Sequence, residues 1–295
     1  MGQAVSLIKE TVSEWSRDRA SRHAAALAFY TTFSIAPLLV IVIALTSAVF
    51  GEEAARGQIE RELGALVGEE AAAFVQGMVA RGEQEDSRGF ASVLGILALL
   101  FGATGAFAEL RGSLNTVWDV EPKSRNFLAG LFESRLLSFA MVLGVGFLLL
   151  VSLVLSAALA ALTESVGRYT GNGEAFLVQV AGFVTSFLVV TALFAMIFKF
   201  LPDDEIQWKD VWIGASVTAL LFSGGKFLIG LYLGRSAVAS TYGAAGALAV
   251  LLLWVYYSAQ ILLLGAEFTQ VYARRFGSHS LTVEESDGIG VLQES

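Results

Sequence analysis

One lysine lies inside a long apolar run, and it is the residue of this sequence most suited to binding chemistry. Lys226 belongs to the run LLFSGGKFLIGLYLG at residues 220–234. An ammonium group in hydrocarbon is costly, so a charge at such a position is a functional candidate by default. Gly224 and Gly225 come directly before it and would allow another helix or a lipid headgroup to approach closely. The chemistry that this pattern favours is recognition of an anionic group.

Two interpretations of Lys226 stay open. The lysine lies roughly 10 Å of helix from Leu233, at the end of its run, and its stem can cover over half of that distance to reach the membrane interface. Alternatively, it faces a substrate in a polar cavity, because Gln179 and Ser156 are expected at a similar depth in neighbouring runs. No carboxylate is expected at that depth, which favours an external anionic partner over an internal ion pair.

Two carboxylates stand at the inner ends of apolar runs. Glu109 follows the second run and has Arg111 close by, and Glu267 follows the last run with Arg274 and Arg275 after it. Carboxylates in this position form interfacial ion pairs or couple transport to protons or ions. Both roles are open for this pair of residues.

The first apolar run is built to bend. Ala24–Phe50 contains no ionisable side chain, and Pro37 lacks the N–H that would bond the carbonyl of Phe33. In lipid that carbonyl needs a hydroxyl group or a neighbouring helix as its partner. We therefore predict a membrane helix with a kink at Pro37 and Ser34, packed within a bundle.

Candidates for enzymatic chemistry are few. Asp203, Asp204 and Glu205 form an acidic cluster that would either be a solvated loop or bind a divalent metal. There is no cysteine, and no G-x-S-x-G, P-loop or HExxH motif is present. We expect no enzyme, no catalytic residue, no resident metal and no cofactor.

The composition indicates the elements that must position these residues. Of 295 residues, 55% are hydrophobic and 16% charged, whereas soluble domains carry about 25% charged residues. Several runs of 20 residues or more are long enough to span a bilayer. We therefore predict an all-α polytopic membrane protein with a domain at 24–277 and six runs: Ala24–Phe50, Gly89–Ala108, Ser138–Leu162, Ala175–Phe200, Val211–Leu233 and Gly243–Ala266.

Lysine and arginine indicate the orientation of these runs. With the N-terminus inside, 12 of the 19 lie on cytoplasmic flanks and 6 on outer flanks, with Lys226 within a span. This asymmetry predicts six crossings with both termini in the cytoplasm. Because six divides into two halves of three, a 3+3 inverted repeat is an open alternative for the internal organisation.

Three segments flank or interrupt the spans. Residues 1–23 carry Val5, Ile8, Val12 and Trp15 at helical spacing, which is typical of a helix lying on a membrane surface or of one packed on the protein's own loops. The insert 51–88 is helical in pattern and acidic, so it is expected outside the membrane and does not support nucleic-acid binding. Residues 278–295 are polar and are predicted to be a disordered tail.

Several blocks of this sequence resemble the YihY/BrkB family of bacterial inner-membrane proteins. They cover residues 10–275: AAALAFYTTFSIAPLL after Asp18, SLNTVWDV, ESRLLSF, Pro202 with WIGA, GGKF, TYGAAGA and LLLWVYYSAQILLLGAE. The resemblance implies a six-span protein of the cytoplasmic membrane. Some members of the family are linked to serum resistance or lipopolysaccharide export. The family also long carried the label ribonuclease BN, which does not suit a chain without a metal cluster or basic RNA surface.

The leading hypothesis is a transporter or translocator for envelope maintenance, acting on an anionic lipid or glycolipid. Its expected partners are membrane lipids and an anionic lipid or solute, with a homo-oligomer left open and no nucleic acid. One alternative is a scaffold that binds an envelope partner through residues 51–88. The remote alternative is a nuclease that uses Asp203 and Asp204.

Overall fold

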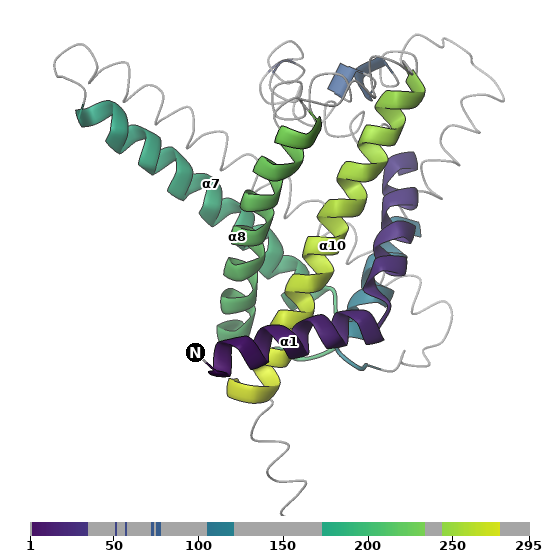
Figure 1. The fold of residues 1–295 in the computed structure, drawn as a ribbon, viewed down its shortest axis with the longest axis vertical. Helices are drawn as coiled ribbons and strands as arrows, with labels where there is room; N and C mark the ends of the chain where they lie inside the picture. Colours follow the sequence, from purple (N-terminus) through teal and green to yellow (C-terminus); the bar gives the residue numbers. More distant parts are fainter. Residues whose placement is uncertain are drawn as a thin grey trace, which may run out of the picture. The chain divides into compact units, whose positions relative to one another are not determined.

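The structure is a computed structural model that describes residues 2–34, 51, 57, 72–73, 75–77, 105–120, 173–233 and 244–277. Within these ranges every regular element is an α-helix, so the predicted all-α class is confirmed for the part of the chain described. Four helices are labelled in Figure 1: α1 (Gly2–Arg17), α7 (Gly173–Phe200), α8 (Trp208–Leu233) and α10 (Ala244–Phe276). Residues 20–34 and 105–117 are also helical.

The last three predicted runs correspond to α7, α8 and α10. Two segments are long and apolar enough to cross a membrane, namely Gly182–Phe200 and Ala245–Phe276. The third run lies outside the described residues, and the first two runs lie mostly outside them. Six crossings, the side of each terminus and the inverted repeat therefore remain predictions, as do the insert 51–88 and the tail 278–295.

The helix ends follow from local chemistry. α7 ends at Phe200, two residues before Pro202, because proline has no N–H for a helix interior and disfavours helical geometry in the residue before it. α8 carries Asp210 in its first turn, and α10 carries two arginines in its last turn, so these charges complement the helix dipoles. α10 also continues past the predicted end of its apolar run at Ala266, because residues such as Val271 are buried there.

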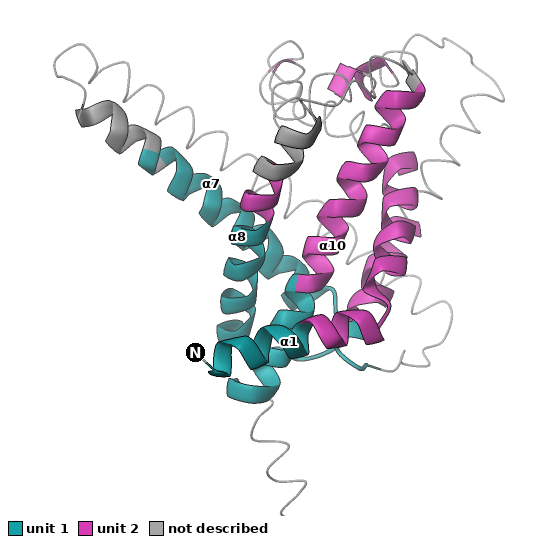
Figure 2. Ribbon diagram, viewed as in Figure 1, with its two compact units in different colours: residues 1–11, 115–221, 265–295 teal, residues 12–114, 222–264 magenta. Residues whose placement is uncertain are grey.

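The chain divides into two compact units, coloured in Figure 2. Unit 1 comprises residues 1–11, 115–221 and 265–295, and unit 2 comprises residues 12–114 and 222–264. Three of the labelled helices, α1, α8 and α10, contribute residues to both units.

In unit 1, α8 and α10 pack antiparallel through two reciprocal glycine–threonine contacts. Thr269 of α10 lies directly against Gly214 of α8, and Thr218 of α8 lies directly against Gly265 of α10. Each threonine hydroxyl donates to the carbonyl four residues earlier in its own helix, Thr218 to Gly214 at 2.7 Å and Thr269 to Gly265 at 2.6 Å. The hydroxyl groups are therefore satisfied inside each helix, and the glycines allow the two backbones to approach closely.

In unit 2, the N-terminal part of α10 contributes to an apolar core. Leu251 and Trp254 pack with Ala72 and Val75, and Phe222 of α8 packs edge-on against Trp254 with ring centroids 6.2 Å apart. Trp254 is buried.

The helices at 20–34 and 105–117 also lie side by side in unit 2. The ring of Tyr30 packs on Gly105, where an added Cβ would lie 2.6 Å from the ring atom Cδ1. His23 and Glu109 are in contact farther along the same two helices. The two contacts run in opposite directions along the chain, so the pair is antiparallel.

Candidate functional site

Lys226 lies in the second half of α8, in unit 2, and its side chain is partly buried. No ion pair or hydrogen bond joins its ammonium group to any side chain or backbone group in the ranges that the structure describes. An ammonium group on an apolar helix favours a nearby anionic group, because burial of an unpaired charge is costly.

The two glycines before Lys226 differ in what they contact. Gly225 is buried, and the hydroxyl group of Tyr257 from α10 lies directly against it. Gly224 is exposed, and a Cβ placed on it would meet no described atom within 4 Å. Another helix thus occupies the surface at Gly225, while the side of α8 at Gly224 is open among the described residues.

Tyr257 is a neighbour of the lysine site that sequence reasoning did not assign to it. Its hydroxyl lies against Gly225, the residue before Lys226 on α8, and both residues belong to unit 2. Two further polar atoms on α10, Ser258 Oγ and Gln260 Oε1, are buried and have no hydrogen-bond partner among the described residues. The sequence YYSAQ, which interrupts an otherwise aliphatic run, is the signal that could have identified this polar stretch.

The side chains of the other residues predicted at the depth of Lys226 lie outside the described part of the chain. Gln179 lies on α7, but its side chain lies outside the described residues, and so does Ser156. Pro37 is likewise outside them. Ser34 is buried and donates to the carbonyl of Thr31 at 3.1 Å, a local bond within the helix.

Glu109 has a histidine as its partner. His23 Nδ1 lies 3.0 Å from Glu109 Oε1, and both side chains are partly buried. Sequence analysis named Arg111 as the basic neighbour, but residues two apart on a helix do not face each other. His23 comes from a segment 86 residues away, which sequence alone does not bring to this carboxylate.

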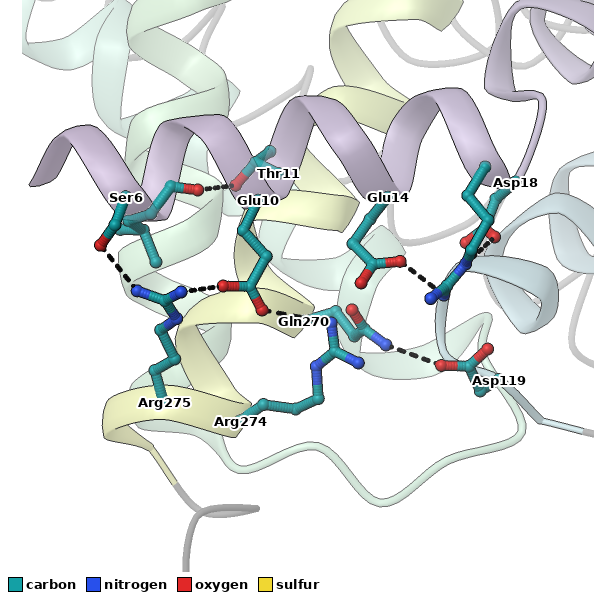
Figure 3. A network of polar contacts seen from close by, with 11 residues as sticks. Ser6, Glu10, Thr11, Glu14, Asp18, Asp119, Gln270, Arg274 and Arg275 are labelled. Carbon is teal, nitrogen blue, oxygen red and sulfur yellow. Dashed lines mark hydrogen bonds and ion pairs between the residues drawn. The ribbon is translucent and has the colours of Figure 1, made fainter. Parts of the chain in front are cut away.

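Glu267 is fully buried on α10, in unit 1. Arg275, one of its predicted basic neighbours, instead forms an ion pair with Glu10 of α1 and donates to Ser6 Oγ at 2.8 Å. Arg274 lies 3.8 Å from the same Glu10 carboxylate. Figure 3 shows both arginines directed at α1. They therefore attach α1 to the last turn of α10.

The acidic cluster after α7 has a structural partner. Asn115 Nδ2 donates to Asp203 Oδ2 at 2.8 Å, and the backbone N–H of Asp203 donates to Asn115 Oδ1 at 2.8 Å. This two-bond clamp joins the end of the helix at 105–117 to the loop before α8. Asp203 is therefore a partly buried residue of the predicted loop, held by Asn115, while Glu205 in the same loop is exposed.

A second amide–carboxylate contact holds the same segment. Gln270 Nε2 of α10 donates to Asp119 Oδ2 at 3.1 Å, as Figure 3 shows. Asp119 has a φ of 52°, and the N–H of Val120 bonds the carbonyl of Asn115 at 2.9 Å. This is the Schellman motif that ends helices, in which glycine is the usual residue at the left-handed position.

Unit 1 thus brings together four segments that are far apart in the sequence. Residues 6–10 contact Arg275, Asp119 contacts Gln270, Asn115 contacts Asp203, and Asp210 lies against Gly277. All four segments are among those that the distribution of lysine and arginine predicts to lie on one side of the membrane.

Comparison with known proteins identifies the family. The family described as Virulence factor BrkB matches residues 11–288. A UPF0761 membrane protein of Rhodospirillum centenum is 28% identical over 90% of this chain and 57% of its own length. A UPF0761 membrane protein of Pseudoalteromonas atlantica is 26% identical over 90% of this chain and 85% of its own length.

A third relative carries a different name. The putative ribonuclease-like protein YfkH of Bacillus subtilis is 26% identical over 92% of this chain and 96% of its own length. No solved structure matches this chain. This chain spans little more than half the length of several relatives and nearly all of others. With the match running from residue 11 to residue 288, and with apolar helices in its structure, this chain belongs to the Virulence factor BrkB family of membrane proteins.

Proposed function

We propose that this protein is a transporter or translocator of the bacterial cytoplasmic membrane that acts in envelope maintenance. Its substrate would be an anionic lipid or glycolipid, and Lys226 would bind the anionic group. The observation that carries the proposal is the ammonium group of Lys226 on α8, which has no partner among the described residues. An anionic substrate would offset the cost of placing that charge in a membrane helix.

The surroundings of Lys226 support a site that is open on one side. The hydroxyl group of Tyr257 packs against Gly225 and joins α10 to α8. Gly224, the residue before it, is exposed. A headgroup could approach the backbone at Gly224 closely because no Cβ is present there. Simple snorkelling of the lysine to the interface is the alternative that the experiment must exclude.

A topology with both termini in the cytoplasm accompanies this proposal. It is supported by the four segments that meet in unit 1, because contacts between side chains require these segments to lie on one side of the bilayer. In this topology Lys226 lies toward the outer end of its span.

The experiment that tests the proposal compares headgroups. The purified protein is reconstituted into vesicles with fluorescent phosphatidylglycerol or fluorescent phosphatidylcholine, and translocation is followed by dithionite quenching. We expect faster movement of the anionic lipid, and we expect Lys226→Ala to abolish this difference while Lys226→Arg retains most of it. The same variants are scored for complementation of an envelope-sensitivity phenotype at equal protein level.

Lys209→Ala is the matched control, because Lys209 is an exposed lysine in the first turn of the same helix. Its loss should change neither measurement. Unchanged translocation and full complementation by Lys226→Ala would remove the lysine from the mechanism and leave snorkelling as its role.

Ribonuclease activity is not part of this proposal, although one relative is named ribonuclease-like. Asp203, the first residue of the acidic cluster, is engaged by Asn115 through two hydrogen bonds, which favours a structural role. Metal-dependent RNA cleavage by the purified protein that disappears in the Asp204→Asn variant would contradict this view.

A further inference from the structure

Part of the exposed face of α1 is apolar, although α1 is not one of the two described segments that are long and apolar enough to cross a membrane. Val5, Ile8 and Val12 are 64%, 61% and 50% exposed. Their spacing of three and four residues places them on one stripe of the helix. A stripe of this kind in a helix of a membrane protein needs an apolar partner.

The opposite side of α1 is held by the protein. Thr11 is buried, Leu7 is partly buried, and Glu10 is paired with Arg275 on the last turn of α10. Figure 3 shows Ser6 and Glu10 directed toward Arg275 of α10. The apolar stripe lies on the face of α1 turned away from Glu10, so this ion pair fixes its direction.

The charges of residues 2–22 are sorted by exposure. The three acids are only partly exposed, and each lies beside an arginine: Glu10 beside Arg275, and Glu14 and Asp18 beside Arg17. The basic residues are all exposed: Lys9, Arg17, Arg19 and Arg22. The charge that this segment presents outward is therefore positive, which complements an anionic lipid surface.

Exposed aromatic side chains occur at the same end of unit 1. Phe200, Trp208 and Trp212 are 47%, 46% and 45% exposed, and the ammonium group of Lys199 lies 5.8 Å from the ring centroid of Trp208. Tryptophan is enriched at the headgroup level of membranes, where lysine is also common. Their exposure near the start of α8 is typical of residues at a membrane interface.

Contacts within unit 1 connect these residues to α1. Asp210, which lies between the two tryptophans in the sequence, is in contact with Gly277 at the end of α10. Two residues before Gly277, Arg275 holds Ser6 and Glu10 of α1. Within unit 1, Figure 1 shows residues 2–11 of α1 running across the end of α10 and not along it. A helix lying in an interface would have this direction relative to a membrane-crossing α10.

We propose that α1 is an interfacial helix that inserts Val5, Ile8 and Val12 into the anionic lipid leaflet on its side of the membrane. Glu10 and Arg275 hold it in the correct rotation, and the exposed basic residues attract the headgroups. The proposal depends on membership of a membrane-protein family and not on the role of Lys226.

Site-directed spin labelling tests this directly, because the chain contains no cysteine. Single variants Val5→Cys, Ile8→Cys and Val12→Cys are labelled with a nitroxide in nanodiscs containing phosphatidylglycerol. Gln3→Cys and Ser13→Cys are matched controls, since both residues are exposed on the same helix. We expect the three apolar sites to show high collision rates with oxygen and at least several-fold lower rates with a water-soluble nickel complex, and the controls to show the reverse.

Two results would overturn the proposal. Equal access of the nickel complex to all five sites would place the apolar stripe in water. Low access of both reagents at the apolar sites would mean that protein, such as a second copy of the chain, covers the stripe. In nanodiscs of phosphatidylcholine alone, oxygen access at the apolar sites should fall, and no change would remove the anionic lipid from the inference.

Discussion

Thr218 on α8 packs directly against Gly265 on α10, and its hydroxyl donates to Gly214, the residue that receives Thr269 in return. The relationship is reciprocal because the two helices are antiparallel and each carries glycine four residues before threonine. The sequences GASVT and GAEFT at these positions are the visible signal of this packing.

Gly265→Ala should destabilise the protein because the added methyl group would overlap the side chain of Thr218. We expect a loss of about 1–3 kcal/mol, the usual cost of overpacking, measured as a lower midpoint of thermal unfolding in detergent. Gly182→Ala on α7 is the control, since a Cβ there meets no described atom within 4 Å. It should be neutral or stabilising because alanine is the better helix former by about 1 kcal/mol. Equal effects of the two variants would contradict the packing.

Exchanging the two side chains of the clamp between Asn115 and Asp203 should preserve much of the stability that single substitutions lose. Asn115→Asp places two carboxylates against each other and should destabilise the protein more than Asn115→Ala does. Asp203→Asn in the same chain supplies a new amide donor, so the double variant should recover most of the loss. A double-mutant cycle from thermal unfolding should give a coupling of about 0.5–3 kcal/mol, and additive single effects would disprove the clamp.

Asp119 combines a left-handed backbone with a hydrogen bond to Gln270, and substitutions separate the two roles. Asp119→Asn should be tolerated best, because asparagine adopts positive φ and keeps an acceptor oxygen. Asp119→Gly keeps the left-handed backbone but loses the hydrogen bond to Gln270, about 0.5–1.5 kcal/mol. Asp119→Ala should be the least stable, since it loses the bond and retains the backbone strain. Thermal unfolding of the three variants gives the order, and a tolerated alanine would contradict this account.

Gly225→Ala should displace the hydroxyl group of Tyr257 and disturb the region around Lys226. Tyr257→Phe removes the nearest atom of the contact, so it should restore part of the stability lost in the Gly225→Ala variant. Gly224→Ala is the matched control, because no described atom lies near that position. If Tyr257→Phe gives no rescue in unfolding measurements, the contact is not the cause of the loss.

The proposed topology predicts opposite labelling of two engineered cysteines. Ser87→Cys in the acidic insert should react with a membrane-impermeant maleimide added to intact cells, and Ser278→Cys after α10 should react only after permeabilisation. The absence of native cysteine gives a silent background. Labelling of both from outside, or of Ser87→Cys only from inside, would disprove the orientation.

Sequence alone predicted what depends on local chemistry. The apolar runs indicated α7, α8 and α10 because a continuous run of hydrophobic side chains has few stable forms other than a buried or membrane helix. Pro202 marked the loop after α7 for the same local reason. Membership of a membrane-protein family was also evident from blocks such as GGKF and LLLWVYYSAQ.

Only the tertiary structure decided which polar residues meet. His23 and Glu109 are 86 residues apart, and Asn115 and Asp203 are 88 apart, so no local pattern could pair them. The extension of α10 past Ala266 was missed because its last turns are held by packing and ion pairs, not by hydropathy. The direction of the apolar stripe of α1 also depends on tertiary contacts. Periodicity shows that a stripe exists, but the ion pair of Glu10 with Arg275 of α10 determines where it points.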